Sequence, residues 1–204
     1  SIADKIVHTG DTNTLIRFNP AGTIRFDTDG DERLRITSAG KLLVGTTSSR
    51  ACAAGEHKIQ IEATGTNGLS LTRTTADAGA INISFIKTRN GAVVQSGDDC
   101  GAINWFADDG TDTNSYTARI QGVVDATPGS NDTPGRLVFS TTADGSSVTT
   151  ERMRINSSGK VGINSTAPDG MLAIEHTSSA PNLTMRNHPA AGVYTNQYGL
   201  ELRH

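Results

Sequence analysis

Residues 32–41 read Glu-Arg-Leu-Arg-Ile-Thr-Ser-Ala-Gly-Lys, and residues 151–160 repeat them as Glu-Arg-Met-Arg-Ile-Asn-Ser-Ser-Gly-Lys. In both copies apolar residues alternate with polar ones before and after a turn, which is the period of a β-strand. The turn ends at Gly40 or Gly159, and glycine readily adopts the positive φ that a three-residue hairpin turn requires. Each copy is therefore predicted to form a β-hairpin.

One face of each hairpin is apolar and is predicted to point inward. Its members are Leu34, Ile36, Leu42 and Val44 in the first copy and Met153, Ile155, Val161 and Ile163 in the second. The arginines on the other face are predicted to stay solvated. A fainter duplication follows each hairpin, at residues 58–62 and 171–175, and the second pass is predicted to begin near Arg136 and to remain incomplete at His204.

The rest of the chain is also predicted to be β-structure, because Asp-Gly and Asn-Gly turn signals recur at short intervals and no stretch has a helical period. The predicted strands cover residues 15–18, 23–26, 33–36, 41–44, 58–61, 69–72, 81–86, 102–106, 117–124, 136–140, 153–155, 161–163, 172–175 and 183–186. Residues 125–135 contain two Pro-Gly pairs and are predicted to form an exposed loop.

The composition favours an assembly over a self-sufficient monomer. Of the 204 residues, 35% are hydrophobic and 4% aromatic, which is little for a core made by one chain. An obligate oligomer that shares one core between copies is therefore predicted; the alternative is an ordinary monomeric β-sandwich with a modest core. A net charge of −3 with scattered cations disfavours nucleic-acid binding, and no apolar run is long enough to insert into a membrane.

Two stretches resemble a known family. Residues 161–168, Val-Gly-Ile-Asn-Ser-Thr-Ala-Pro, are similar to a Val-Gly-Ile-Gly-Thr-Thr-Ser-Pro element of bacteriophage tail fibre and tailspike proteins, where it usually follows Arg-Met-Arg-Ile. Residues 133–145 resemble a stretch common in fibres of phages of cyanobacteria and other aquatic hosts. The departures are Asn164, Ser165 and Ala167 in the second copy, with Leu43 and residues 48–49 in the first.

The resemblance implies an elongated homotrimer whose distal parts contact the host, located in the virion tail and made in the host cytoplasm. Its partners would be other copies of itself, other phage tail proteins and host surface polysaccharide, and the inward residues of the hairpins would form the trimer core. Such fibres often carry a self-cleaving chaperone domain near their end, and no region resembling its Ser-Lys site is seen before His204.

The predicted fold is accordingly all-β: an elongated homotrimer of β-hairpin modules, as a β-prism or triple-β rod, with an inserted antiparallel β-sandwich-like region. The first hairpin module is assigned to residues 1–50, a β-rich middle domain with exposed loops to residues 51–135, and the second module with the start of an incomplete unit to residues 136–204. The predicted function is a structural and adhesive shaft that presents or contributes to a receptor-binding tip.

A receptor or glycan site within the segment is the alternative function. Its candidate contacts are Trp105, Tyr116, Asp108, Asp109, Asp112 and Asn131. Alternation sends Trp105 and Phe106 to opposite faces, so one ring is available to stack on a sugar, while the competing interpretation places one of them in the trimer core.

Catalytic and metal sites are not predicted, and no cofactor is expected. The turns at Asp98-Asp99 and at residues 108–112 would supply the acid pair of a polysaccharide-degrading tailspike only if folding brings them together. Asp27, Asp29, Asp31 and Glu32 fail the spacing of a calcium loop, because Ser38 stands where its last carboxylate belongs. They are predicted to be solvated carboxylates of a hairpin turn.

Overall fold

The fold is all-β over the residues that the computed structural model describes, which are 4–19, 21–52 and 55–175. Within these ranges there is no helix, and hence none that could cross a membrane. The strands are β1 (Lys5–His8), β2 (Asp11–Asn19), β3 (Thr23–Thr28), β4 (Asp31–Ile36), β5 (Leu42–Val44), β6 (Ala51–Cys52), β7 (Gly55–Glu56), β8 (Ile59–Ile61), β9 (Asp99–Ala107), β10 (Ser115–Val124), β11 (Gly135–Thr142), β12 (Thr149–Ile155), β13 (Val161–Ile163) and β14 (Leu172–Ile174).

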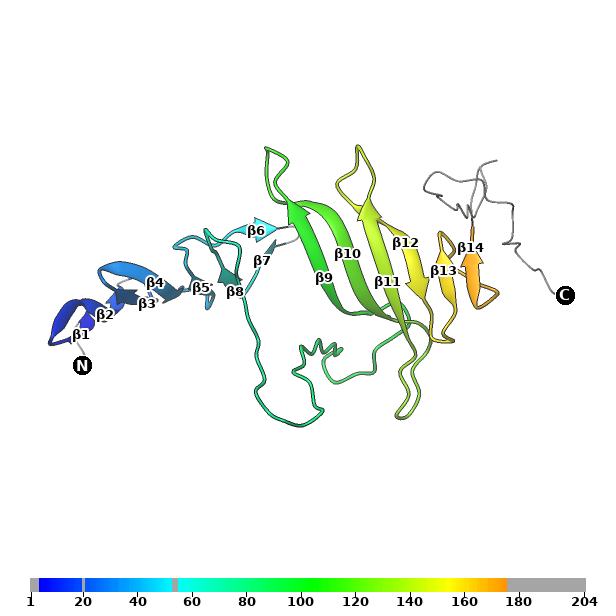
Figure 1. The fold of residues 1–204 in the computed structure, drawn as a ribbon, viewed down its shortest axis with the longest axis horizontal. Coiled ribbons are helices and arrows are strands. Elements are labelled where there is room, and N and C mark those ends of the chain that lie inside the picture. Colours follow the sequence, from blue (N-terminus) through cyan, green and yellow to red (C-terminus); the bar gives the residue numbers. More distant parts are fainter. Residues whose placement is uncertain (1–3, 20, 53–54, 176–204) are drawn as a thin grey trace, which may run out of the picture.

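Two six-stranded sheets follow one another along the long axis of the molecule (Figure 1). The first sheet has the order β1-β2-β3-β4-β5-β8 and the second β9-β10-β11-β12-β13-β14. In both, neighbouring strands are antiparallel except the last pair, which is parallel. The repeat is therefore a whole sheet, and the second sheet begins at Asp99, earlier than the start near Arg136 that the sequence suggested. Whether the second pass is complete by His204 stays a prediction, because residues 176–204 lie outside the described residues.

The registers of the two sheets also match. Ile24 lies opposite Ile36 in the first sheet, as Leu137 lies opposite Ile155 in the second. Each sheet then has a bulge at the same step, after Phe26 in one and after Phe139 in the other. A bulge shifts every later residue to the opposite face, so its repetition preserves the facing of all side chains between the sheets.

The two predicted hairpins are confirmed, with the same turn in each. Gly40 and Gly159 have φ of 69° and 75°, the left-handed region that favours glycine. The N–H of Thr37 donates to the carbonyl of Lys41 at 2.9 Å, and that of Asn156 to the carbonyl of Lys160 at 3.0 Å. The identical glycine and lysine positions of the two copies thus fix one turn geometry.

Residues 62–98 connect the two sheets and contain no named strand, so the strands predicted at 69–72 and 81–86 are absent from the single chain. Both stretches alternate apolar and polar residues, as a strand does. However, no other strand of the same chain lies beside them to supply the backbone hydrogen bonds that a strand needs. The strand predicted at residues 183–186 lies outside the described residues. Three short strands, β1, β6 and β7, were not predicted.

The core buried by one chain is small. Among the described residues its buried apolar side chains are Leu15, Leu43, Val123, Val124 and Val138. The two six-stranded sheets follow one another along the chain and are not stacked face to face (Figure 1). The second sheet runs without interruption across residues 135 and 136, where the sequence placed a domain division.

Candidate assembly interface

An uninterrupted apolar face covers one side of the first sheet. One row crosses all six strands, and a second row crosses five of them. The first row is Ile6, Ile16, Phe26, Leu34, Val44 and Ile61, and the second is Phe18, Ile24, Ile36, Leu42 and Ile59. Neither row contains a charged residue. None of the apolar side chains in the two rows is buried within the chain.

The second sheet has the same face. Its first row is Ile103, Ile120, Phe139, Met153, Ile163 and Ile174, and its second row is Gly101, Gly122, Leu137, Ile155, Val161 and Leu172. Position by position these rows correspond to those of the first sheet, with Gly122 in the place of Phe18. We call the two surfaces defined by these rows the apolar faces.

All eight residues predicted to point inward lie on the apolar faces. Ile36 and Ile163 are 40% and 39% exposed, and the other six are only half-buried. Their place in a trimer core stays a prediction. The other residues of the faces were not predicted, although the alternation of apolar and polar residues at 15–18 and 24–26 indicated that the faces extend over these strands.

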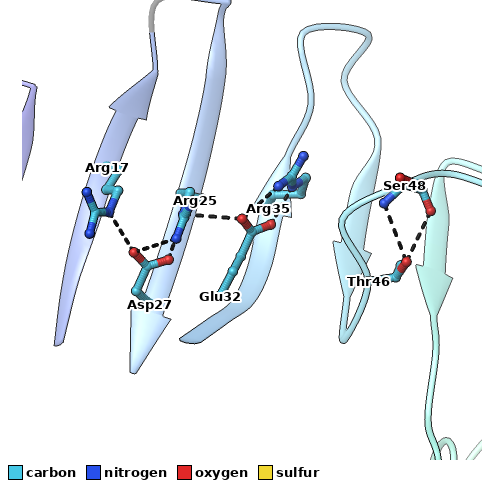
Figure 2. A network of polar contacts seen from close by, with 7 residues as sticks. All are labelled: Arg17, Arg25, Asp27, Glu32, Arg35, Thr46 and Ser48. Atoms are coloured by element: carbon cyan, nitrogen blue, oxygen red, sulfur yellow. Dashed lines mark hydrogen bonds and ion pairs between the residues drawn. The ribbon is translucent and has the colours of Figure 1, made fainter. Parts of the chain in front are cut away.

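The opposite face of the first sheet carries a chain of alternating charges across three strands (Figure 2). The Nε atoms of Arg17 and Arg25 each lie 2.7 Å from a carboxylate oxygen of Asp27. The Nε atom of Arg25 also lies 3.2 Å from a carboxylate oxygen of Glu32, and Glu32 accepts a hydrogen bond from Arg35 Nη2 at 2.7 Å. We call these five residues the charge ladder.

The charge ladder is partly buried, which corrects two predictions. Asp27 is only 2% exposed rather than solvated, and Arg35 is half-buried rather than free in solvent. Leu43, which lies between Arg35 and Gln60 in adjacent strands, is fully buried on this face. The sequence showed the polarity of these positions but not their pairing, and paired arginines can cover apolar surface with their stems.

Hydrogen bonding sets the pKa of Asp27. The hydrogen bond from Arg25 lowers the pKa of its carboxyl below the usual value, and the one from Arg17 acts in the same direction, while burial opposes both. The charged carboxylate is therefore the stable form at neutral pH. Arg25 and Arg35 have a raised pKa for the reciprocal reason, through Asp27 and Glu32 respectively.

The second sheet has an equivalent of one ion pair of the charge ladder, and it has a different set of hydrogen bonds at its end. Glu151 and Arg154 pair at 2.5 Å and 2.8 Å, as Glu32 and Arg35 do. At the end of the sheet, Asp125 accepts from Arg136 and from the Ser157 N–H, each at 2.9 Å. Burial raises the pKa of Asp125, but these hydrogen bonds outweigh it and hold the pKa at about 2.

The predicted glycan contacts fall in three places. Trp105 lies on the same side as the apolar face, 46% exposed, beside a hollow of about 490 Å³ that Phe139 and Arg152 also line. Phe106 points to the other side, as predicted, and its ring centre is 4.4 Å from that of Tyr116.

The candidate loops lie at opposite ends of the sheet. Asp108, Asp109 and Asp112 are in the β9–β10 loop next to Tyr116, whereas Asn131 is in the β10–β11 loop at the other end (Figure 1). The neighbouring β11–β12 loop, which was not predicted as a site, reaches the first group, because the Tyr116 N–H donates to the Ser147 carbonyl at 3.3 Å.

The two acidic turns do not meet. Asp98-Asp99 and residues 108–112 lie at the two ends of strand β9, which is about 26 Å long. Asp98 pairs with Arg89 at 2.6 Å, and Asp109 accepts from backbone groups of its own loop. Across the described ranges, no three His, Cys, Asp or Glu side chains gather as a metal site would require.

Two solved structures have a similar fold. One is the carboxy-terminal domain of the bacteriophage T5 L-shaped tail fibre, with a TM-score of 0.59 and 15% identity over 96% of this chain and 87% of that one. The other is the same domain with its intramolecular chaperone domain, with a TM-score of 0.62, 16% identity and 97% of this chain covered. The chain spans 60% of the length of that second structure. No protein-family model and no curated protein matches the sequence.

Proposed function

We propose that this chain is a segment of a bacteriophage tail fibre, in which three copies close around a common axis through their apolar faces and form a shaft for host attachment. The fold similarity to a tail fibre domain supports the class of protein. The observation that carries the mode of action is the pair of apolar faces. Their rows contain no charged residue, and their own chain leaves the side chains of these rows half-buried or exposed, with Phe85 lying over Gly101.

Burial of these faces would supply the stability that a single chain lacks. Covering a half-exposed apolar side chain of this size contributes about 1 kcal/mol. The rows of the first face hold eleven such side chains, and those of the second hold ten. A β-prism would bury these faces, because the apolar face of each copy meets the equivalent faces of two others. The charge ladder then faces away from the axis, where arginines and carboxylates remain in contact with water.

Receptor contact is the second part of the proposal, and it follows from the loops. The β9–β10 and β11–β12 loops project beyond the same end of the second sheet (Figure 1). Asp108, Asp109, Asp112 and Tyr116 are therefore better placed for a host polysaccharide than Trp105, which the assembly would cover. Three equivalent copies of a weak site raise the avidity through effective concentration.

The molar mass in solution tests the assembly. Light scattering on the purified chain is expected to give about three times the 21.4 kDa of one copy, unchanged on dilution to the nanomolar range. A stable, folded 21.4 kDa species would contradict the proposal. Binding of host envelope polysaccharide by the trimer, lost when residues 108–114 are replaced by a short glycine loop, would support the receptor role.

A further inference from the structure

A thiol and an imidazole meet on the short two-stranded sheet formed by β6 and β7. The Sγ atom of Cys52 lies 2.8 Å from the Nε2 atom of His57, which is hydrogen-bond distance. Cys52 is half-buried and His57 is exposed, so a reagent in solution can reach the pair. A nucleophile in contact with a base that can accept its proton is the basic arrangement of covalent chemistry in proteins.

The backbone of β6 and β7 brings these two side chains together. Cys52 lies opposite Gly55, and His57 follows two residues after Gly55. Side chains two residues apart on a strand point to the same side, so the thiol and the imidazole share one side of the hairpin. Gly55 has no side chain to separate them, and nothing lies within 4 Å of the position of a Cβ there. The imidazole therefore reaches the thiol directly.

Gln60 in β8 holds the open end of this hairpin closed. Its Oε1 atom accepts a hydrogen bond from the Arg50 N–H at 2.8 Å, and its Nε2 atom donates to the His57 carbonyl at 3.2 Å. One side chain thus bridges the residue before β6 and the residue after β7. Because the first sheet restrains the backbone that carries both partners, the thiol and the base lose little freedom when they react.

The nearest cation on the same side of the hairpin is already paired. The Arg50 guanidinium donates to both carboxylate oxygens of Glu62, at 2.7 Å and 3.1 Å. Its charge is therefore matched by a carboxylate, and the group in contact with the thiol is the imidazole of His57. This leaves His57 as the acceptor of the thiol proton.

Cys100 provides a reference thiol without this arrangement. It is the extra residue of a bulge in β9 and lines a hollow of about 410 Å³. Leu137 and Ile155 of the apolar face line the same hollow. A thiol among apolar side chains is a poor nucleophile, so the two cysteines of the chain are expected to differ in reactivity.

We infer that Cys52 and His57 form a nucleophilic pair that captures an accessible disulfide by thiol–disulfide exchange. His57 Nε2 takes the proton of the Cys52 thiol while the Cys52 sulfur attacks one sulfur of the disulfide. A new S–S bond forms to that sulfur and the original S–S bond breaks. The leaving sulfur keeps the bonding electron pair and takes the proton from His57. One disulfide replaces another, so no oxidant or reductant is consumed.

This pair lies beside the loop proposed for receptor contact. The Thr113 hydroxyl in the β9–β10 loop donates to the carbonyl of Ala51 in β6 at 3.0 Å, one residue before Cys52 (Figure 1). Reversible binding at this loop would raise the effective concentration of a partner's disulfide at the thiol. The chemistry of the pair is independent of the proposed function, whereas its use at the host surface rests on that function.

The rate of reaction with dithiodipyridine tests the pair in the native protein. This neutral disulfide releases a thiopyridone that absorbs in the near ultraviolet, and Cys52→Ser and Cys100→Ser assign the signal to each thiol. We expect Cys52 to react at least about 10-fold faster than Cys100 at pH 7, and both to react at similar rates in the unfolded chain. Equal rates in the native protein, or a faster Cys100, would overturn the inference.

Two variants separate the role of His57 from the exposure of Cys52. His57→Gln keeps a hydrogen-bonding side chain that cannot take up a proton, and it should slow the reaction of Cys52 by about 10-fold or more at pH 7. Lys58→Gln places the same side chain at the next residue, whose ammonium group donates to the Ala39 carbonyl instead. It should change the rate less than about 2-fold. An unchanged rate in His57→Gln, or equal losses in both variants, would contradict the inference.

Incubation with host envelopes, followed by peptide mapping without reduction, identifies the source of the disulfide. A small thiol adduct on Cys52 would indicate a low-molecular-weight disulfide, and a cross-linked host peptide would indicate a protein; either supports the inference. Cys52 recovered as a free thiol from protein bound to envelopes would overturn capture at the host surface and leave the proposed function intact. Protein that does not bind the envelopes would contradict the proposed function, and the dithiodipyridine rates then decide the chemistry of the pair.

Discussion

Ser140 occupies in the second sheet the position that Asp27 holds in the first. Ser140 lies opposite Glu151 and Asp27 opposite Glu32, each directly after the bulge, and both are buried. The two sheets have thus kept one backbone register while a charged residue in one is replaced by a neutral one in the other. The charge of Asp27 is matched by Arg17 and Arg25, and the second sheet has Gln121 and Val138 at those places. The second sheet therefore lacks both the carboxylate of Asp27 and the arginines that pair with it.

Removal of the charge at this position should destabilise the first sheet. Asp27→Asn keeps the volume but weakens hydrogen bonds to two arginines, and we expect a loss of about 2 kcal/mol in the free energy of unfolding. Urea unfolding of the assembled protein measures it. The matched control is Asp31→Asn, since Asp31 pairs with Arg33 on the surface and should lose less than about 0.5 kcal/mol. Equal losses would show that burial of the ladder does not matter.

The acid sensitivity of the second sheet should depend on Asp125. Its pKa is lowered to about 2, so its stabilising effect is complete above the unfolded pKa near 3.8 and is lost as the pH falls through about 2. Asp125→Asn should therefore be less stable than the parent at pH 6, by about 2 kcal/mol, and the difference should shrink between pH 4 and pH 2. Thermal unfolding at several pH values measures this. A difference that is independent of pH would contradict the assignment.

The hairpins could be predicted from the sequence because their determinants are local: alternation, and a glycine at the position of positive φ. The full sheets could not, because β1–β3 and β9–β11 share a register but hardly any identical residues. Residues 69–72 and 81–86 have a correct strand period and still lack a partner, which no local pattern can supply. The burial of Asp27 depends on Arg17 in another strand, so the sequence indicated only a polar position.

The contact of Phe85 with the second sheet should be sensitive to a single methyl group. Gly101→Ala places a Cβ against the Phe85 side chain, whereas Gly122→Ala adds the same atom where no atom lies within 4 Å. Both changes reduce the freedom of the unfolded chain equally, so within one chain they differ by the contact with Phe85. We expect Gly101→Ala to lower the unfolding free energy of the assembly by about 1 to 3 kcal/mol relative to Gly122→Ala. Calorimetry measures it, and indistinguishable transitions would show that Phe85 is free to move away.

The role of the apolar faces in assembly can be tested by comparing the same substitution at two residues of similar exposure. Ile103 on the face is 51% exposed in the single chain and Val148 in the β11–β12 loop is 63% exposed, so a monomer would tolerate an aspartate equally at either place. If three copies bury the face, Ile103→Asp puts three uncompensated carboxylates around one axis, where each must either lose its charge or separate the subunits. We expect a 21.4 kDa species or aggregate for Ile103→Asp and an unchanged assembly for Val148→Asp, measured by light scattering. Assembly that survives Ile103→Asp would place the contact between copies elsewhere than on this face.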